Sequence, residues 1–160
     1  MKKSSLREAI LAHLRRELAQ QIGAAQMARD EAISEESRAE NKYDTHSQET
    51  AYLAEGQARI ANEIDASIAH YAALPLPDFA PDAPIALGAL VELENRDGKT
   101  HWYFLGPRAG GIEVQLEGQT VLVVTPPSPL GGVLLGKRAG ETVPLSGRGA
   151  KQAQRIRSVA

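Results

Sequence analysis

The stretch LREAILAHLRRELAQQI, residues 6–22, carries an apolar side chain at every fourth position. A period near 3.6 residues places these side chains on one face of an α-helix. Ser5, with Glu8 three residues later, has the pattern of a capping box at the start of such a helix. The sequence therefore predicts one long amphipathic helix from Ser5 to about Ile33. The apolar face consists of Leu6, Ile10, Leu14, Leu18 and Ile22.

A second apolar stripe follows after a polar gap. Asp44 or Thr45, the latter with Gln48 as a box partner, offers the N-cap of a second helix. Pro75 stops that helix at about Leu74, because its ring and missing N–H cannot continue the helix. Two long helices joined by a short link predict an antiparallel helical hairpin, a coiled coil, over residues 1–74. The second apolar stripe consists of Leu53, Ile60, Ile64, Ile68 and Tyr71.

The chain changes character at PLPDFAPDAP, residues 75–84, where four prolines favour an extended linker. Beyond it the apolar period becomes two, and a turn at 96–98 joins two strands as a β-hairpin. The segment 128–136 has the serine, proline and glycine punctuation of a short helix. The predicted fold class is α+β, with a small antiparallel β-sheet domain over residues 85–160. Its strands are expected at 89–95, 100–105, 112–116, 120–125, 141–145 and 153–159.

The composition excludes several classes of protein. Apolar residues make up 42% of the 160 residues and charged residues 24%, which is typical of a folded domain. The chain has no cysteine and therefore no disulfide framework or thiolate zinc site, and no apolar stretch approaches a membrane span. Its four histidines do not cluster, and no nucleotide-binding or hydrolase motif is present. We expect a cytoplasmic protein that is not itself an enzyme.

The charges are segregated along the chain. Residues 30–55 hold eight acids against Arg38 and Lys42, and eight minus two gives a local charge of −6. The simplest interpretation is a solvated helical face. Alternatively, Glu36, Glu40 and Asp44, spaced by four residues, would share one helical face and hold a hard cation. The last quarter is basic, which allows a nucleic-acid surface, although Trp102, Tyr103 and Phe104 are expected in the core.

The segment SPLGGVLLGKRAGETV, residues 128–143, resembles the C-terminal signature of the bacterial Gre family of transcription elongation factors. The preceding VELENRDGKTHWYFLGP, residues 91–107, is similar to a hairpin of that family. In the first half, Glu40 with Asn41, then Glu55 with Gly56, resemble the family's ENAEY and EGRI segments. The resemblance covers nearly the whole chain.

This resemblance implies a finger that enters the secondary channel of RNA polymerase and an FKBP-like domain that docks at the channel rim. Glu40 and Asp44 would share a magnesium ion with the polymerase, Glu36 being a third acid of the tip, and the chain would bind no cofactor stably. It implies a monomeric partner of RNA polymerase, with DNA binding as a family term, indirect contact with nascent RNA and no membrane association. The implied docking residues are Ser128, Pro129, Leu130, Gly131, Leu134, Leu135, Gly136 and Lys137.

One departure from the family pattern leaves the function open between alternatives. Ser37 stands where the family has an aspartate, three residues before Glu40, and Tyr43 is one place early. The first hypothesis is a factor that stimulates cleavage of backtracked RNA, and the second is a channel regulator without cleavage. A third is an FKBP-like peptide-binding module, which would need an aromatic-lined pocket.

Overall fold

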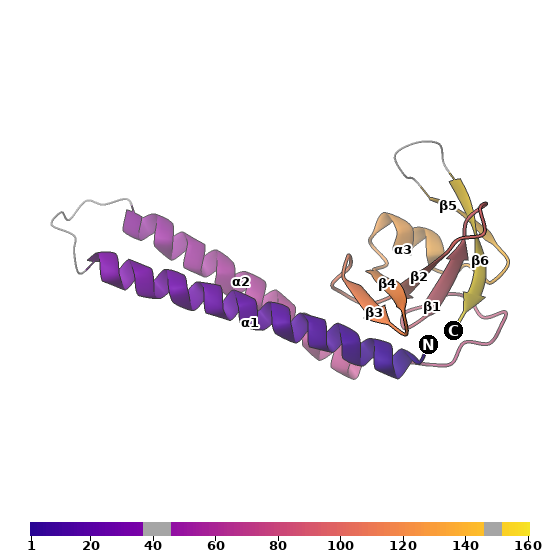
Figure 1. Ribbon diagram of the computed structural model, residues 1–160, viewed down its shortest axis with the longest axis horizontal. Helices are drawn as coiled ribbons and strands as arrows, with labels where there is room; N and C mark the ends of the chain where they lie inside the picture. The colour runs from indigo at the N-terminus through magenta and orange to yellow at the C-terminus, as the bar shows by residue number, and fades with distance from the viewer. Residues whose placement is uncertain (37–45, 146–151) are drawn as a thin grey trace. The chain divides into compact units, whose positions relative to one another are not determined.

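The computed structural model describes residues 1–36, 46–145 and 152–160. Two helices are followed by six strands and a short third helix, which confirms the predicted α+β class (Figure 1). Among these residues, no helix contains a stretch long and apolar enough to cross a bilayer. In chain order the elements are α1 (Lys3–Glu36), α2 (His46–Ala73), β1 (Leu90–Glu94), β2 (Thr100–Leu105), β3 (Glu113–Leu116), β4 (Gln119–Val124), α3 (Pro129–Leu134), β5 (Thr142–Leu145) and β6 (Gln152–Val159).

The chain divides into two compact units. One, here called the sheet unit, contains Met1–Leu11 together with His70–Ala160, and the other, the helical unit, contains Ala12–Ala69. The division therefore runs through both long helices, whereas the sequence placed a boundary at the proline-rich segment 75–84. The starting residues of α1 and the final residues of α2 belong with the sheet. The division into a hairpin over residues 1–74, a linker over 75–84 and a domain over 85–160 stays a prediction.

Within the helical unit, α1 and α2 run antiparallel (Figure 1). Leu14 and Ile64 are buried there, as is the polar Ser67, whose Oγ donates to the Glu63 carbonyl at 2.8 Å. Both predicted apolar stripes were expected to be buried, but their members further along the helices are exposed. A pair of helices has too few neighbours to cover them. The exposed members are Ile22 (57%), Leu53 (57%) and Ile60 (43%).

The start of α1 also differs from the prediction. The helix begins at Lys3, and the Leu6 N–H donates to the Lys2 carbonyl at 3.1 Å. Ser5 consequently lies inside the first turn and is not the N-cap. The α-amino group of Met1 lies 3.4 Å from the Glu117 carboxylate, so a long-range contact accompanies the earlier start. The N-caps proposed for the second helix, Asp44 and Thr45, lie outside the described residues.

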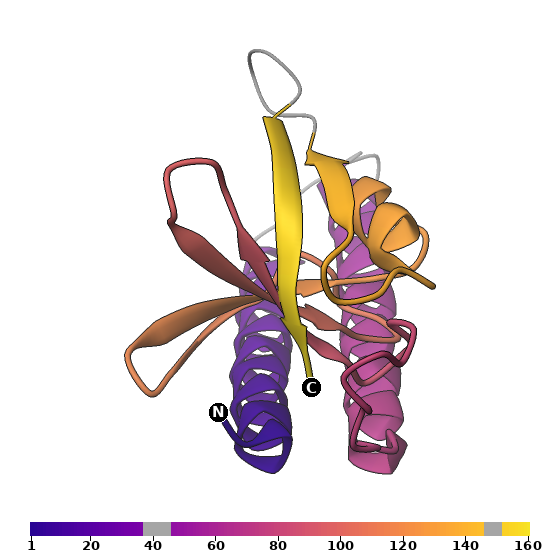
Figure 2. The ribbon, with the colours of Figure 1, turned by 90° about the vertical axis from the view of Figure 1, so that its right-hand side faces the viewer.

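The six strands form one mixed sheet in the order β3-β4-β2-β1-β6-β5. Figure 2 shows β6, in yellow, between β1 and β5. The predicted hairpin is confirmed, since β1 and β2 pair antiparallel with Val91 opposite Tyr103. The expectation of an entirely antiparallel sheet is wrong, because β2 and β4 are parallel, with Phe104 opposite Val123. The connection from β2 to β4 contains β3, which pairs antiparallel with β4. This connection supplies the crossover that parallel neighbours need.

Each face of the sheet carries its own core. On one face, Leu134 of α3 packs with strand residues that include Val91, Leu105 and Ile156. Successive strand residues point to opposite faces, so the buried Leu90 and Phe104 face the other side. The ends of α1 and α2 supply further buried residues to the same compact unit. They are Leu6, Ile10, Leu11, Tyr71 and Leu74.

Tyr71 is the clearest contact between a helix end and the strands. Its side chain is fully buried, and its hydroxyl donates to the Arg108 carbonyl at 2.8 Å. A Cβ built on Gly106 would lie 2.1 Å from the Tyr71 Oη and 3.2 Å from Val123. Only glycine at position 106 therefore leaves room for the ring. Burial raises the pKa of the Tyr71 phenol, which stays neutral and able to donate.

Candidate functional site

The segment with the expected docking residues folds as α3 and the turns beside it. Ser128 is the N-cap, with extended backbone angles of φ −73° and ψ 152°. Its Oγ accepts a hydrogen bond from the Gly131 N–H at 3.1 Å and donates to the Thr125 carbonyl at 2.7 Å. Pro129 occupies the first turn, where a missing N–H removes no helical hydrogen bond. The short helix expected from the serine and proline is confirmed.

Removing the cap should measurably weaken the sheet unit. We expect Ser128→Ala to lower the free energy of unfolding by about 1 kcal/mol, because the Gly131 N–H loses its acceptor. Urea denaturation followed by circular dichroism measures the change. Ser128→Thr keeps the hydroxyl and serves as the matched control. An unchanged unfolding midpoint for Ser128→Ala would show that the cap contributes no stability.

Two other residues of the expected docking set have structural roles. Leu134 is fully buried in the core on the α3 face of the sheet. Gly131 is also buried, and a Cβ at this position would lie 1.9 Å from the Thr125 carbonyl oxygen. Leu134 therefore presents no side chain at the surface, and Gly131 has none. Packing alone therefore requires these residue types at the two positions, and a part for the segment in docking stays a prediction.

The end of α3 is tied to the segment before β1. Gly136 has a φ of +79°, which favours glycine, and its N–H donates to the Ile85 carbonyl at 2.8 Å. The Ile85 N–H in turn donates to the Lys137 carbonyl at 2.7 Å. These two hydrogen bonds pair residues far apart in sequence, so Gly136 and the backbone of Lys137 also have structural roles.

A small charged group follows this turn. Lys137 Nζ lies 2.9 Å from Glu141 Oε1, and the Arg138 N–H donates to Glu141 Oε2 at 2.7 Å. The side-chain hydrogen bond from Lys137, followed by the backbone bond from Arg138, lowers the pKa of the Glu141 carboxyl. The Arg138 guanidinium also donates to the Asp82 carbonyl. Lys137 is partly exposed and already has an acidic neighbour within its own chain.

The outward side of α3 is apolar and carries little side chain. Pro129, Gly132 and Gly136 are exposed, and Leu135 is 47% exposed. Residues 126–136 contain no charged side chain. Small and apolar groups of this kind allow the backbone of a partner to approach closely. Of the expected docking set, Pro129, Leu135 and Gly136 are exposed on this side, and Lys137 is partly exposed beside it.

The expected acidic tip lies largely outside the described residues. Glu36 is the last residue of α1, while Glu40, Asp44 and the departure at Ser37 fall in the segment that the structure does not describe. Whether the three acids come together stays a prediction. Among residues 1–36, 46–145 and 152–160, no group of three His, Cys, Asp or Glu side chains is arranged to hold a metal ion.

The aromatic residues do not form the pocket that a peptide-binding module would need. Trp102 and Tyr103 are consecutive in β2 and therefore point to opposite faces of the sheet. Phe104 is fully buried, and Phe79 packs at the edge of the core on the α3 face. These four side chains therefore do not line one pocket, and the third hypothesis finds no support in the described residues.

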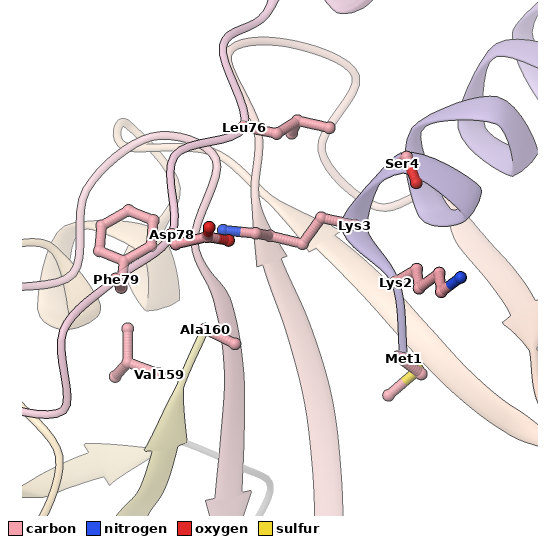
Figure 3. A pocket seen from close by; sticks show the side chains of 9 residues that line it. All are labelled: Met1, Lys2, Lys3, Ser4, Leu76, Asp78, Phe79, Val159 and Ala160. Carbon is pink, nitrogen blue, oxygen red and sulfur yellow. The ribbon is translucent and has the colours of Figure 1, made fainter.

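Sequence reasoning missed a hollow beside the start of α1 (Figure 3), which has a volume of about 510 Å³. Lys3 extends toward Asp78 and Phe79, with its Nζ 4.9 Å from the centre of the Phe79 ring. Its ammonium donates to the Pro77 carbonyl, and burial lowers the pKa of Lys3 while Asp78 opposes that change. No local sequence signal links Lys3 to the proline-rich segment. The hollow is lined by Met1, Lys2, Lys3, Ser4, Leu76, Asp78, Phe79, Val159 and Ala160.

No family model matches the chain, and no curated protein matches it by sequence. Several solved structures match over nearly its whole length. The transcription factor Gfh1 is 19% identical with a TM-score of 0.42, covering 94% of this chain and 93% of that chain. The GreA factor homolog 1 (Gfh1) protein of Thermus thermophilus is 21% identical with a TM-score of 0.41, covering 94% of each chain. Thermus aquaticus Gfh1 is 24% identical with a TM-score of 0.40, covering 95% of this chain and 94% of that chain.

Proposed function

We propose that the chain binds bacterial RNA polymerase as a secondary-channel factor and acts through the polymerase active centre. The observation that carries the proposal is the segment 128–143, which resembles the Gre signature and folds here into a serine-capped helix with an apolar outward side. The antiparallel pair of α1 and α2 supplies the second part that such a factor needs. At about 1.5 Å per residue, the 34 residues of α1 extend roughly 50 Å.

In this proposal the two parts of the protein have different tasks. The outward side of α3, with Pro129 and Leu135, contacts the polymerase near the channel rim. The acids between α1 and α2 would act at the catalytic magnesium of the polymerase. In the cleavage-stimulating form, carboxylates of this chain would help to hold the ion, which would supply an activated water for hydrolysis of the RNA backbone. Glu40 and Asp44 are the proposed ligands, and the bond is broken by the polymerase and not by this chain.

Binding and cleavage place different demands on the sequence. Binding requires the helical pair and an outward docking side, whereas sharing an ion requires carboxylates held within about 0.5 Å of a productive geometry. Ser37 removes one acid of the family's pair. We therefore propose binding as the primary function, and a channel regulator without cleavage as the form that Ser37 favours.

The test uses core RNA polymerase halted in a backtracked complex with labelled RNA and magnesium. We expect the chain to bind the polymerase, and Leu135→Asp to weaken binding at least about tenfold because it places a charge on the apolar docking side. Asp97→Ala, in the exposed β1–β2 turn, is the control and should bind as the unmodified chain does. Absence of binding by the unmodified chain would refute the proposal.

The same complexes separate the two forms of the function. We expect little shortening of the RNA by the unmodified chain and an increase of about tenfold or more with Ser37→Asp, because a second carboxylate joins Glu40 at the ion. Glu40→Ala in the Ser37→Asp background should abolish the gain. Efficient cleavage by the unmodified chain that depends on Glu40 and on Glu36 or Asp44 would instead show that another acid replaces the missing aspartate.

A further inference from the structure

The sheet has two outer edges, β3 and β5, whose backbone groups differ in what they offer to another strand. In an antiparallel pair, every second residue points its N–H and C=O groups toward the neighbouring strand, and the residues between them point theirs away from it. Outward N–H and C=O groups can pair with a further strand, and proteins often close such an edge with proline or charged residues. The register of each edge strand therefore shows whether a further strand can pair there.

The β5 edge is closed by a proline. The Ile156 N–H of β6 donates to the Glu141 carbonyl at 2.8 Å, so Glu141 points its carbonyl toward β6. Thr142 and Pro144 lie one and three residues further along the same register, and their backbone groups therefore point outward. Pro144 has no N–H to donate. A strand added at β5 would lack that hydrogen bond.

The β3 edge is open. The Val123 N–H of β4 donates to the Ile112 carbonyl at 2.8 Å, directly before β3 begins. The register then continues without a shift through β3, so its even-numbered residues pair with β4. Glu113 and Gln115 consequently point their N–H and C=O groups outward, and both residues are exposed. The backbone of β3 can therefore donate to a further strand and accept from it.

This edge is also acidic. Residues 109–125 contain Glu113 and Glu117 and no basic residue. The Glu117 carboxylate lies 3.4 Å from the Met1 α-amino group, so Glu113 supplies the charge that a strand on this edge would meet. A second copy of β3 would bring the same acids and no cation. A peptide with basic side chains complements the edge better than a second copy does.

We propose that the β3 edge binds an extended peptide that carries basic side chains at alternate positions. The peptide pairs as an added strand with the outward backbone groups of Glu113 and Gln115. Because successive side chains of a strand point to opposite faces, every second side chain of the peptide lies on the face of Glu113, where a lysine or arginine meets the carboxylate. The side chains between them lie on the face of the apolar Val114 and Leu116, where β-branched residues fit.

The length of β3 sets the strength of binding. The strand has four residues, so an added strand forms few hydrogen bonds with it and binds weakly. An ion pair at an exposed edge is screened by salt, so binding weakens further as the ionic strength rises. The proposal does not depend on the polymerase and is tested on this chain alone.

The test is titration of the isotope-labelled full chain at low salt with a capped hexapeptide of alternating lysine and valine, followed by NMR. We expect saturable binding and, at saturation, slower hydrogen exchange at the amides of Glu113 and Gln115, because each gains an acceptor. The amides of Val114 and Leu116 already face β4 and should change less. A hexapeptide of alternating glutamate and valine is the control, and we expect it to bind at least about tenfold more weakly.

Gln115→Pro gives β3 the chemistry that Pro144 gives β5. Because the Gln115 N–H points outward, its loss should keep the pairing of β3 with β4 and weaken binding of the lysine peptide at least about tenfold. Gln115→Thr is the matched control, since it also loses the side-chain hydrogen bond to Thr120 but keeps the N–H, and it should bind as the unmodified chain does. Glu113→Lys should bind the glutamate peptide more tightly than the lysine peptide.

Methylated peptides test the same hydrogen bonds without altering the protein. In an added strand, only one alternating set of peptide N–H groups faces β3. Methylating the nitrogens of one set should therefore abolish binding, and methylating those of the other set should not. Absence of saturable binding by the unmodified chain would overturn the proposal, as would equal binding of the two methylated peptides. If Gln115→Pro does not fold, as judged by circular dichroism, the methylated peptides decide the question.

Discussion

Gly131→Ala is expected to destabilise the protein more than any other single methyl addition in α3. The new Cβ would lie 1.9 Å from the carbonyl oxygen of Thr125 and 2.6 Å from its carbonyl carbon, both backbone atoms. Thr125 also accepts the hydrogen bond from Ser128, so moving its carbonyl away would disturb the cap. We expect a loss of at least about 3 kcal/mol in the free energy of unfolding, measured by urea denaturation.

Gly132→Ala is the matched control for this prediction. Its Cβ would lie 3.3 Å from the Pro126 carbonyl oxygen, which is tight but requires a movement of only tenths of an ångström. Alanine also favours the helical conformation over glycine by about 1 kcal/mol. We expect the stability of Gly132→Ala to stay close to that of the unmodified protein. Equal losses for the two variants would show that the packing of Gly131 against Thr125 is not the cause.

The second large effect is expected at Tyr71. Tyr71→Ala removes a fully buried ring from the second face of the sheet and should lower the free energy of unfolding by about 3–5 kcal/mol. Tyr71→Phe keeps the ring and removes only the hydrogen bond to the Arg108 carbonyl, so a loss of about 1 kcal/mol is expected. Similar losses for the two variants would contradict a packing role for the ring.

Gly106→Ala tests whether the Tyr71 hydroxyl oxygen limits the space at position 106. Its Cβ would lie 2.1 Å from the Tyr71 Oη but 3.0 Å from the Cζ, so part of the conflict disappears when the hydroxyl is absent. The cost of Gly106→Ala should therefore be smaller in the Tyr71→Phe background than in the unmodified chain. Additive losses in this double-mutant cycle would mean that the two residues do not interact.

The same tyrosine gives the protein a dependence on alkaline pH. Burial raises the pKa of the Tyr71 phenol above its ordinary value of 10.0. The unfolded chain therefore releases this proton at a lower pH than the folded chain does, and the free energy of unfolding falls as the pH rises above about 10. Tyr71→Phe should lose less stability between pH 8 and pH 11 than the unmodified chain.

The local features of the fold could be read from the sequence because each has a local cause. The prolines after α2 cannot continue a helix, so α2 ends before them. Gly98 has a positive φ, which allows the turn between β1 and β2. In that turn, the Asn95 carboxamide accepts hydrogen bonds from the N–H groups of Asp97 and Lys99. Ser128 with Pro129 correctly marked the start of α3. Such signals depend on neighbouring residues alone.

The features that the sequence did not predict depend on residues far apart in the chain. The parallel pairing of β2 with β4 is a choice between sheet neighbours, and alternation of apolar residues does not distinguish a parallel from an antiparallel partner. The exposure of Ile22 and Leu53 depends on how much a second helix covers, which periodicity does not report. The close packing of Gly131 depends on Thr125, and that of Gly106 depends on the distant Tyr71. The sequence alone does not report either contact.

The sheet unit is built from segments that lie far apart in the chain, which affects its rate of folding. Leu93 of β1 pairs with Ile156 of β6, and the buried Leu6 belongs to the same compact unit as strands that begin more than eighty residues later along the chain. Contacts between residues so far apart in sequence form slowly, because the chain between them loses conformational entropy before the contact stabilises it. The helices of Ala12–Ala69 rely on contacts within each turn and can form earlier. Refolding after dilution from denaturant should therefore show helical signal first and burial of Tyr71 later.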